Sequence, residues 1–267
     1  MNTNALPAPL DVKLMNMTAS VLFVGCALLV LAAGAWWVLR YPGFAIARIV
    51  VQGELVHNNA VTLRANVAPH LVGNFFTVDL RKAREAFEQV PWVRKAAVRR
   101  EFPGSLHVVL EEHDAVAYWG PESGSAMVNT QGEVFEANVD DVEQDGLPRL
   151  QGPSGTSGEV LQMYGLMQPV FEPLGMDVEE LALTGRGGWR ATLDTGAVVE
   201  LGGGTPAEVV ARAKRFARTL TQVAAQYKRR VDALESADLR HAGGYALRLK
   251  GVTTMGPEAA AAAATRR

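Results

Sequence analysis

The stretch GNFFTVDLRKAREAFEQVPWVRKAAVRREFPGSLHVVLEE, residues 73–112, determines how the first folded part of the chain is organised. Apolar residues recur at three- and four-residue spacing along residues 79–89, and Asp79 suits the N-cap, so this segment is predicted to be an amphipathic helix. Residues 96–100 and 106–112 have strand character and flank a turn at Phe102-Pro103-Gly104-Ser105. We expect Trp92 and the Phe75-Phe76 pair to lie in the core.

The residues upstream of this stretch complete a small module. Residues 44–53 form a β-rich run that ends at Gly53, and residues 60–64 show a short helical pattern. The predicted element order is therefore β-α-α-β-β over residues 44–112. This mixture of strands and helices predicts an α+β module.

A charge-free run precedes this module. Residues 18–39 lack charged side chains, and about 22 residues at 1.5 Å per residue span roughly 33 Å, enough to cross a bilayer. Trp36, Trp37 and Tyr41 gather at its far end, where aromatic rings favour the headgroup layer. We predict a transmembrane helix over 18–40 after a cytoplasmic segment, 1–17. A signal peptide cleaved near Ala33-Gly34-Ala35 is disfavoured, because the apolar run is long and continues into two tryptophans.

The orientation of that helix does not follow from charge. Lys13 and the terminal amine flank one side, while Arg40 and Arg48 flank the other. The short segment before the helix and the long chain after it favour export of the C-terminal part.

A second, larger α+β domain is predicted over residues 113–252. Helices are expected at 157–172 and from Thr205-Pro206-Ala207-Glu208 onward, where Thr205 and Glu208 match a capping box. Strands are expected at 127–129, 133–135, 178–183, 189–193, 198–201, 237–240 and 245–249. The second helix has a predicted buried stripe made of Val209, Ala213, Phe216, Leu220, Val223, Tyr227 and Val231. The Ala-rich tail, 253–267, is too short for a stable isolated helix and is predicted to be disordered.

Composition and motifs exclude several chemistries. The net charge of -2 gives no basic field for nucleic acid, and a lone cysteine, Cys26, cannot form an intrachain disulfide. Gly202-Gly203-Gly204-Thr205 lacks the Lys-Ser/Thr ending of a phosphate-binding loop. The acidic run Glu111-Glu112-His113-Asp114 contains possible metal ligands. Consecutive residues of a strand point to opposite faces, however, which disfavours a metal site there. No recognisable nucleophile–base motif is present; this does not by itself exclude catalysis, because catalytic groups can be assembled in space. No cofactor is expected.

Several pieces, in order and spacing, resemble the FtsQ/DivIB family of bacterial cell division proteins. The matching pieces are 73–80, 91–93, 98–103, 106–112 with 115–119, 129–135, 147–150 with 152–153, 199–202 and 238–240. The resemblance covers roughly residues 18–252. It implies a POTRA domain at 44–112 and the family's β domain, with a mainly antiparallel sheet, at 113–252.

The resemblance also implies a function. Family members are non-enzymatic single-pass proteins of the inner membrane with periplasmic domains, and they bind the coiled-coil proteins FtsB and FtsL and link other divisome components. FtsB adds a strand to the last strand of the β domain, here 244–250. The implied partner-binding residues are Arg240, His241, Gly244, Tyr245, Ala246, Leu247, Arg248 and Leu249. Arg240 is expected to pair with a partner carboxylate, and Tyr245 to serve as an aromatic anchor because His241 replaces a frequent tyrosine.

Two other readings stay open on the sequence. The first is a membrane-anchored cell-wall hydrolase or peptidoglycan-binding protein. The second is a POTRA chaperone for outer-membrane proteins, which would bind unfolded strands broadly.

Overall fold

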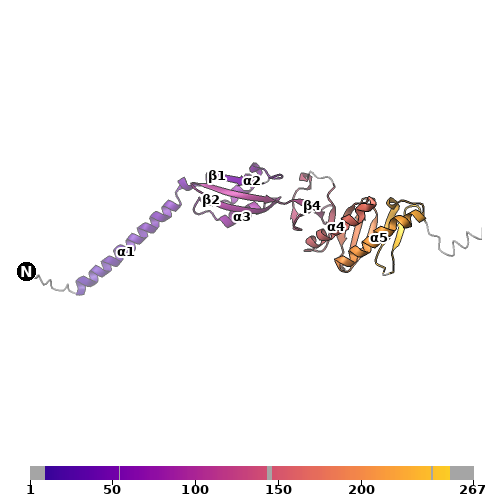
Figure 1. Cartoon of the computed structure of the whole chain (residues 1–267). Coiled ribbons are helices and arrows are strands. Elements are labelled where there is room, and N and C mark those ends of the chain that lie inside the picture. Colours follow the sequence, from indigo (N-terminus) through magenta and orange to yellow (C-terminus); the bar gives the residue numbers. More distant parts are fainter. Residues whose placement is uncertain (1–9, 54, 143–145, 242, 253–267) are drawn as a thin grey trace, which may run out of the picture. The chain divides into compact units, whose positions relative to one another are not determined.

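The computed structural model describes residues 10–53, 55–142, 146–241 and 243–252. The chain divides between Glu112 and His113 into two compact units (Figure 1). The predicted disordered tail, 253–267, and residues 1–9 of the predicted cytoplasmic segment lie outside the described residues.

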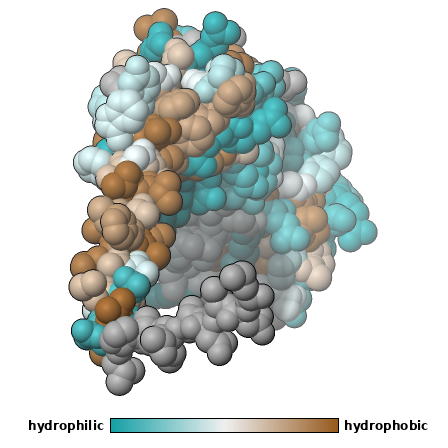
Figure 2. Space-filling model, turned by 90° about the vertical axis from the view of Figure 1, so that its left-hand side faces the viewer, coloured by the Kyte–Doolittle hydropathy of each residue, from teal (hydrophilic) through white to brown (hydrophobic). Residues whose placement is uncertain are grey.

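The N-terminal apolar run is one continuous helix, α1 (Leu10–Leu39). It begins eight residues before the predicted start at residue 18, so Asp11 and Lys13 lie within its first turns. Among the described residues it is the one helix long and apolar enough to cross a membrane, and its side chains are exposed. The surface of α1 is mostly hydrophobic in the space-filling view (Figure 2). Such a surface needs a nonaqueous environment, as a membrane anchor would have.

The module that follows has the predicted β-α-α-β-β order. Its elements are β1 (Arg48–Gln52), α2 (Ala60–Val67), α3 (Leu80–Glu88), β2 (Val93–Glu101) and β3 (Ser105–Glu112). The sheet order is β1-β3-β2, with β1 parallel and β2 antiparallel to β3. The Asp79 carboxylate accepts hydrogen bonds from the backbone N–H groups of Arg81 and Lys82, which confirms the predicted N-cap.

The core of this module confirms two of the three aromatic predictions. Trp92 and Phe75 are buried with Leu63, Phe87 and Val108. The prediction for Phe76 was wrong, because its side chain is 44% exposed. In the turn 74–77, the Phe76 amide donates a hydrogen bond to the Asn74 side chain. Within this turn the Phe75 side chain is buried, whereas that of Phe76 is largely exposed.

The second unit is built on a mixed sheet of nine strands. They are β4 (Ala115–Trp119), β5 (Ala126–Asn129), β6 (Val134–Glu136), β7 (Arg149–Gln151), β8 (Val178–Leu183), β9 (Trp189–Leu193), β10 (Val198–Gly202), β11 (Leu234–Asp238) and β12 (Ala246–Leu249). Their order is β12-β11-β10-β9-β8-β7-β4-β5-β6. Most neighbouring pairs are antiparallel, as predicted, while β4–β7, β7–β8 and β10–β11 are parallel. The two edges are therefore β12 and β6.

Two helices, α4 (Ser157–Phe171) and α5 (Pro206–Gln226), pack against each other and against this sheet. The capping box at the start of α5 is confirmed: Thr205 Oγ1 accepts from the Glu208 amide, and Glu208 Oε2 accepts from the Thr205 amide. Short 3-10 turns at Pro42–Phe44, Ala68–His70, Val139–Asp141, Glu172–Leu174 and Val231–Ala233 join the larger elements.

The predicted buried stripe of α5 is correct only for its first part. Val209, Ala213, Phe216 and Leu220 are fully buried, and Ala224 continues the buried line. Tyr227 is 48% exposed and Val223 is only half-buried, so the predicted burial of these two was wrong. Val231 packs against the core but lies in the 3-10 turn beyond the end of α5. The short edge strand β12 does not cover the last turn of α5, which leaves apolar side chains open beside it.

Candidate partner-binding edge

The outermost strand β12 contacts the sheet on one side only. It pairs antiparallel with β11, with Ala237 opposite Leu247 and Asp238 opposite Ala246. No strand of the described part of the chain lies beyond it. Within the described residues, the Leu249 carbonyl accepts from the Val252 amide at 3.1 Å, and the rest of the outward row of β12 has no neighbouring strand. The observed strand is shorter than the predicted 244–250, and Gly244 lies in the turn before it.

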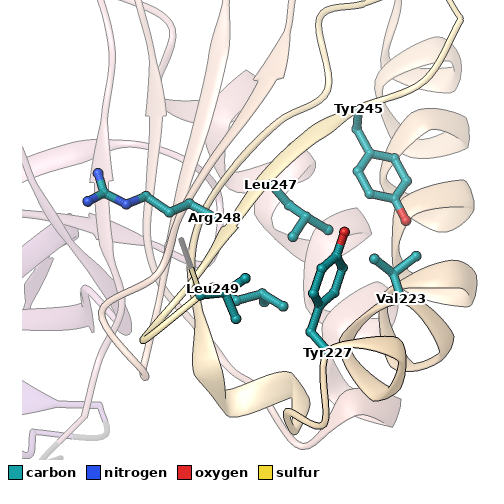
Figure 3. Close-up of a pocket in the computed structure, with 7 residues that line it drawn as sticks. Val223, Tyr227, Tyr245, Leu247, Arg248 and Leu249 are labelled. Atoms are coloured by element: carbon teal, nitrogen blue, oxygen red, sulfur yellow. The ribbon is translucent and has the colours of Figure 1, made fainter. Parts of the chain in front are cut away.

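Side chains of β12 alternate between two faces. Leu247 and Leu249 are directed toward α5, whereas Ala246 and Arg248 are exposed on the other side (Figure 3). Arg248 Nε lies 3.1 Å from Glu235 Oε2 on β11. This ion pair is exposed, so it adds little to stability.

A hollow of about 660 Å³ opens between β12 and the C-terminal end of α5 (Figure 3). Aliphatic side chains, two tyrosines and one arginine line it: Val223, Tyr227, Tyr245, Leu247, Arg248, Leu249 and Val252. We call this the β12 groove. It places aliphatic and tyrosine side chains beside a strand edge that no other described strand covers, and strand-addition sites combine such a pocket with an open edge for affinity and specificity.

The aromatic residue predicted as an anchor is engaged inside the domain. The Tyr245 ring makes an edge-to-face contact with Phe216, with ring centroids 5.0 Å apart. Its hydroxyl lies 2.7 Å from Thr219 Oγ1 on α5. Tyr245 therefore forms a wall of the β12 groove, while the more exposed aromatic ring in the groove is that of Tyr227. The sequence had shown Tyr227 only as a member of the predicted buried stripe.

Arg240 lies beyond the end of β11 and is already paired. Its Nε and Nη2 donate to the two carboxylate oxygens of Asp238 at 2.9 and 2.6 Å, and its own amide donates to Oδ1. These hydrogen bonds, with the positive charge, lower the pKa of Asp238 to about 2. A partner carboxylate would thus meet a guanidinium that is fixed in place by Asp238.

The other residues predicted for the site lie at the start of β12. His241 and Gly244 are exposed and border a small hollow of about 20 Å³ together with Tyr245. The structure therefore gathers Tyr245, Leu247, Arg248 and Leu249 around the groove and leaves Arg240, His241 and Gly244 on the adjoining turn.

The acidic run 111–114 makes structural contacts. Glu112 accepts hydrogen bonds from the backbone amides of Val56, His57 and Asn58, and from the Asn58 side chain. Glu111 pairs with Arg94. His113 stacks on Phe135 with ring centroids 4.1 Å apart. Within the described ranges, no group of three or more His, Cys, Asp or Glu side chains is placed to hold a metal ion.

Comparison with known proteins places both units in one family. A family model described as "POTRA domain, FtsQ-type" matches residues 44–113, and one described as "Cell division protein FtsQ/DivIB, C-terminal" matches residues 117–240. A curated relative from Thiomonas arsenitoxydans, named "Cell division protein FtsQ", is 39% identical over 93% of this chain and 91% of its own length. Proteins of the same name from Burkholderia pseudomallei (38% identity, 91% and 94%) and Neisseria meningitidis (31% identity, 85% and 92%) are similar over comparable spans.

Proposed function

Because this chain belongs to the FtsQ/DivIB family of cell division proteins, we propose that it is a non-catalytic, membrane-anchored divisome protein that captures a coiled-coil partner of the FtsB or FtsL type. α1 anchors it in the inner membrane with the N-terminus in the cytoplasm, and both folded units lie in the periplasm. The partner contributes a strand that pairs with β12. The observation that carries this proposal is that, among the described residues, no strand lies beyond β12, whose edge borders the β12 groove.

The direction of the backbone groups supports pairing at this edge. The Lys250 amide donates inward, to the Ala233 carbonyl at 2.8 Å. Amides alternate in direction along a strand. The N–H of Arg248 is therefore expected to face β11, and the N–H groups of Leu247 and Leu249 to face outward.

Backbone pairing alone would bind weakly. Each net hydrogen bond contributes about 0.5–1.5 kcal/mol, and the short edge offers only a few, while ordering the partner opposes association. The β12 groove supplies the remaining affinity: an apolar partner side chain placed next to Leu247 and Tyr227 would be removed from water. Specificity follows from which partner side chains fit between these two residues.

A proline at Leu247 tests the proposal. Proline removes the outward N–H and is tolerated on edge strands, where no ladder hydrogen bond of the protein itself is lost. The matched control is Leu247→Ala, which shortens the same side chain and keeps the N–H. We expect Leu247→Pro to bind the FtsB-type partner at least about tenfold more weakly than Leu247→Ala, a difference of about 1.4 kcal/mol. Equal affinity of the two variants would rule out strand addition at this position.

The proposed topology has its own test. A reporter that is active only in the periplasm, fused to the C-terminus, is expected to be active in cells. A silent reporter in a stably expressed fusion would reverse the orientation.

A further inference from the structure

Four phenylalanines form a connected group where the chain passes from α1 into the POTRA domain. Phe44 contacts Phe76 with ring centroids 5.1 Å apart, Phe76 contacts Phe75 at 5.2 Å, and Phe75 contacts Phe102 at 6.4 Å, all in edge-to-face arrangements. We call this group the aromatic cluster. It joins three segments that are far apart in the sequence: the end of the 3-10 turn after α1, the turn before α3 and the turn between β2 and β3.

Backbone hydrogen bonds hold these three segments together. The Phe75 amide donates to the Phe44 carbonyl at 2.8 Å, and the Ala47 amide donates to the Gly104 carbonyl at 2.9 Å. The two turns that carry Phe76 and Phe102 are therefore fixed beside the point where the chain leaves α1.

Much of this cluster is open to solvent. Phe102 is 79% exposed, Phe76 is 44% exposed, and Val72 in the neighbouring loop is also exposed. Only Phe75 is buried. Exposed apolar groups of this size, gathered at one end of a small domain, mark a surface that contacts another apolar phase.

The chain itself limits how far this surface can lie from the end of α1. Only four residues lie between Leu39, the last residue of α1, and Phe44, and five fully extended Cα-to-Cα steps span at most about 17 Å. The 3-10 turn at Pro42–Phe44 shortens this reach. Trp36, Trp37 and Tyr41 already place aromatic rings at the same end of α1, where a membrane-spanning helix would cross the headgroup layer.

We propose that the aromatic cluster inserts Phe76 and Phe102 into the headgroup layer of the bilayer that α1 spans, so that the POTRA domain rests on the membrane surface. This inference rests on the proposed anchoring by α1. The short tether keeps the cluster near lipid in every copy of the protein, whereas a protein partner would have to be recruited there. Insertion would restrict the tilt of the POTRA domain and fix the height at which it stands above the bilayer.

Depth-dependent quenching tests this inference in the full chain, reconstituted in nanodiscs with and without brominated lipid. A fluorescent thiol label is placed at Val72→Cys in a Cys26→Ser background. The matched control is Val56→Cys, which is similarly exposed, at 78%, but whose amide is bound by Glu112 at the opposite end of β3. Ser105 and Glu112 are seven strand residues apart, about 23 Å.

We expect brominated lipid to quench the label at residue 72 several-fold more than the label at residue 56. The double substitution Phe76→Ser and Phe102→Ser is expected to abolish that difference while leaving the circular dichroism spectrum unchanged, because both side chains are exposed. Equal quenching at residues 72 and 56, or quenching that survives the double substitution, would overturn the proposal and leave a protein partner as the occupant of the cluster.

A second experiment distinguishes failure of this inference from failure of the proposed anchoring. The same fluorescent label is placed on the native Cys26, which is exposed on α1, and its quenching by brominated lipid is measured. Quenching at Cys26 without quenching at residue 72 would reject membrane insertion of the cluster alone. Absence of quenching at Cys26 would reject the anchoring as well, and both proposals would fall together.

Discussion

The hydroxyl oxygens of Tyr245 and Thr219 lie 2.7 Å apart, and this hydrogen bond ties the segment that leads into β12 to α5. The Tyr245 ring also packs edge-to-face on Phe216, a fully buried residue of the same helix. An edge strand has a neighbour on one side only, so its position depends on such additional contacts. Tyr245 therefore sets the shape of the β12 groove from inside the domain.

Substitutions at Tyr245 should separate the hydrogen bond from the ring contact. Tyr245→Phe is expected to lower the free energy of unfolding of the β domain by about 1 kcal/mol, the contribution of one hydrogen bond. Tyr245→Ala is expected to lower it by about 2–3 kcal/mol, because the packing on Phe216 is lost as well. Denaturant unfolding followed by tryptophan fluorescence measures both. Equal losses for the two variants would mean that the ring contact contributes nothing.

Tyr227 should affect partner binding without affecting stability. Its side chain is 48% exposed at the mouth of the β12 groove, so Tyr227→Ser is expected to change the free energy of unfolding by less than about 0.5 kcal/mol. Partner affinity is expected to fall about tenfold or more, since an aromatic contact at an interface is commonly worth over 1 kcal/mol. Titration calorimetry with the partner's periplasmic segment provides the measurement.

Leu166→Ser is the matched control for Tyr227→Ser. Leu166 is similarly exposed, at 41%, and lies on α4. The control should bind the partner as the unmodified protein does. A parallel loss of affinity in both variants would show that the effect of Tyr227 is not local to the groove.

The Asp238–Arg240 pair should make the stability of the β domain depend on acid pH. Arg240 lowers the pKa of Asp238 from 3.8 to about 2, chiefly through its side-chain hydrogen bonds. Because the folded-state pKa is depressed, the stabilisation is fully present above the unfolded-state value and is lost as the pH falls through about 2. Arg240→Ala should remove this dependence, so the difference in stability between the two proteins should be constant above pH 5 and shrink between about pH 4 and 2.

The midpoint of the Asp238 carboxyl resonance, followed by NMR, checks this assignment directly. It is expected near 2 in the unmodified protein and closer to 3.8 in Arg240→Ala. A midpoint that does not move would show that Arg240 is not the cause of the low pKa.

Glu112 should be required to order the loop at residues 56–58. Burial of its carboxylate acts to raise its pKa, but the hydrogen bonds from His57, Asn58 and Val56 outweigh burial and lower it. Glu112→Ala would leave these amides without their acceptor, and we expect local opening to become easier by about 2–3 kcal/mol. Hydrogen exchange at the His57 and Asn58 amides is expected to accelerate roughly 30- to 150-fold. Glu111→Ala, which removes an exposed carboxylate paired with Arg94 and contacts none of these amides, should leave that exchange nearly unchanged.

Local signals in the sequence predicted the helices well. The caps at Asp79 and Thr205 depend on side chains within three residues of the helix start, and both are present as predicted. Strands that pair with segments distant in the sequence were harder to predict. The strand β4 has no clear alternation, and its partners β5 and β7 include a parallel neighbour that is reached only after a long connection.

The edge position of the last strand could be predicted from the sequence, whereas the surface around it could not. The family resemblance placed the last strand at the binding position, and β12 does lie at the edge of the sheet. The direction of the Tyr245 side chain and the exposure of Tyr227 depend on how far β12 extends over α5. The hydrophobic periodicity of α5 carries no information about the length of that strand. The local sequence likewise could not distinguish Phe75, which is buried, from its neighbour Phe76, which is largely exposed.

Amide hydrogen exchange at Leu247, measured in the full chain with and without the FtsB-type partner, tests the central claim most directly. Leu247 N–H is expected to face outward and exchange freely in the absence of partner, while the amide of Arg248 is expected to face β11. Strand addition predicts that the partner slows exchange at Leu247 at least about tenfold and changes Arg248 much less. Saturating partner that leaves the Leu247 rate unchanged would contradict pairing at β12.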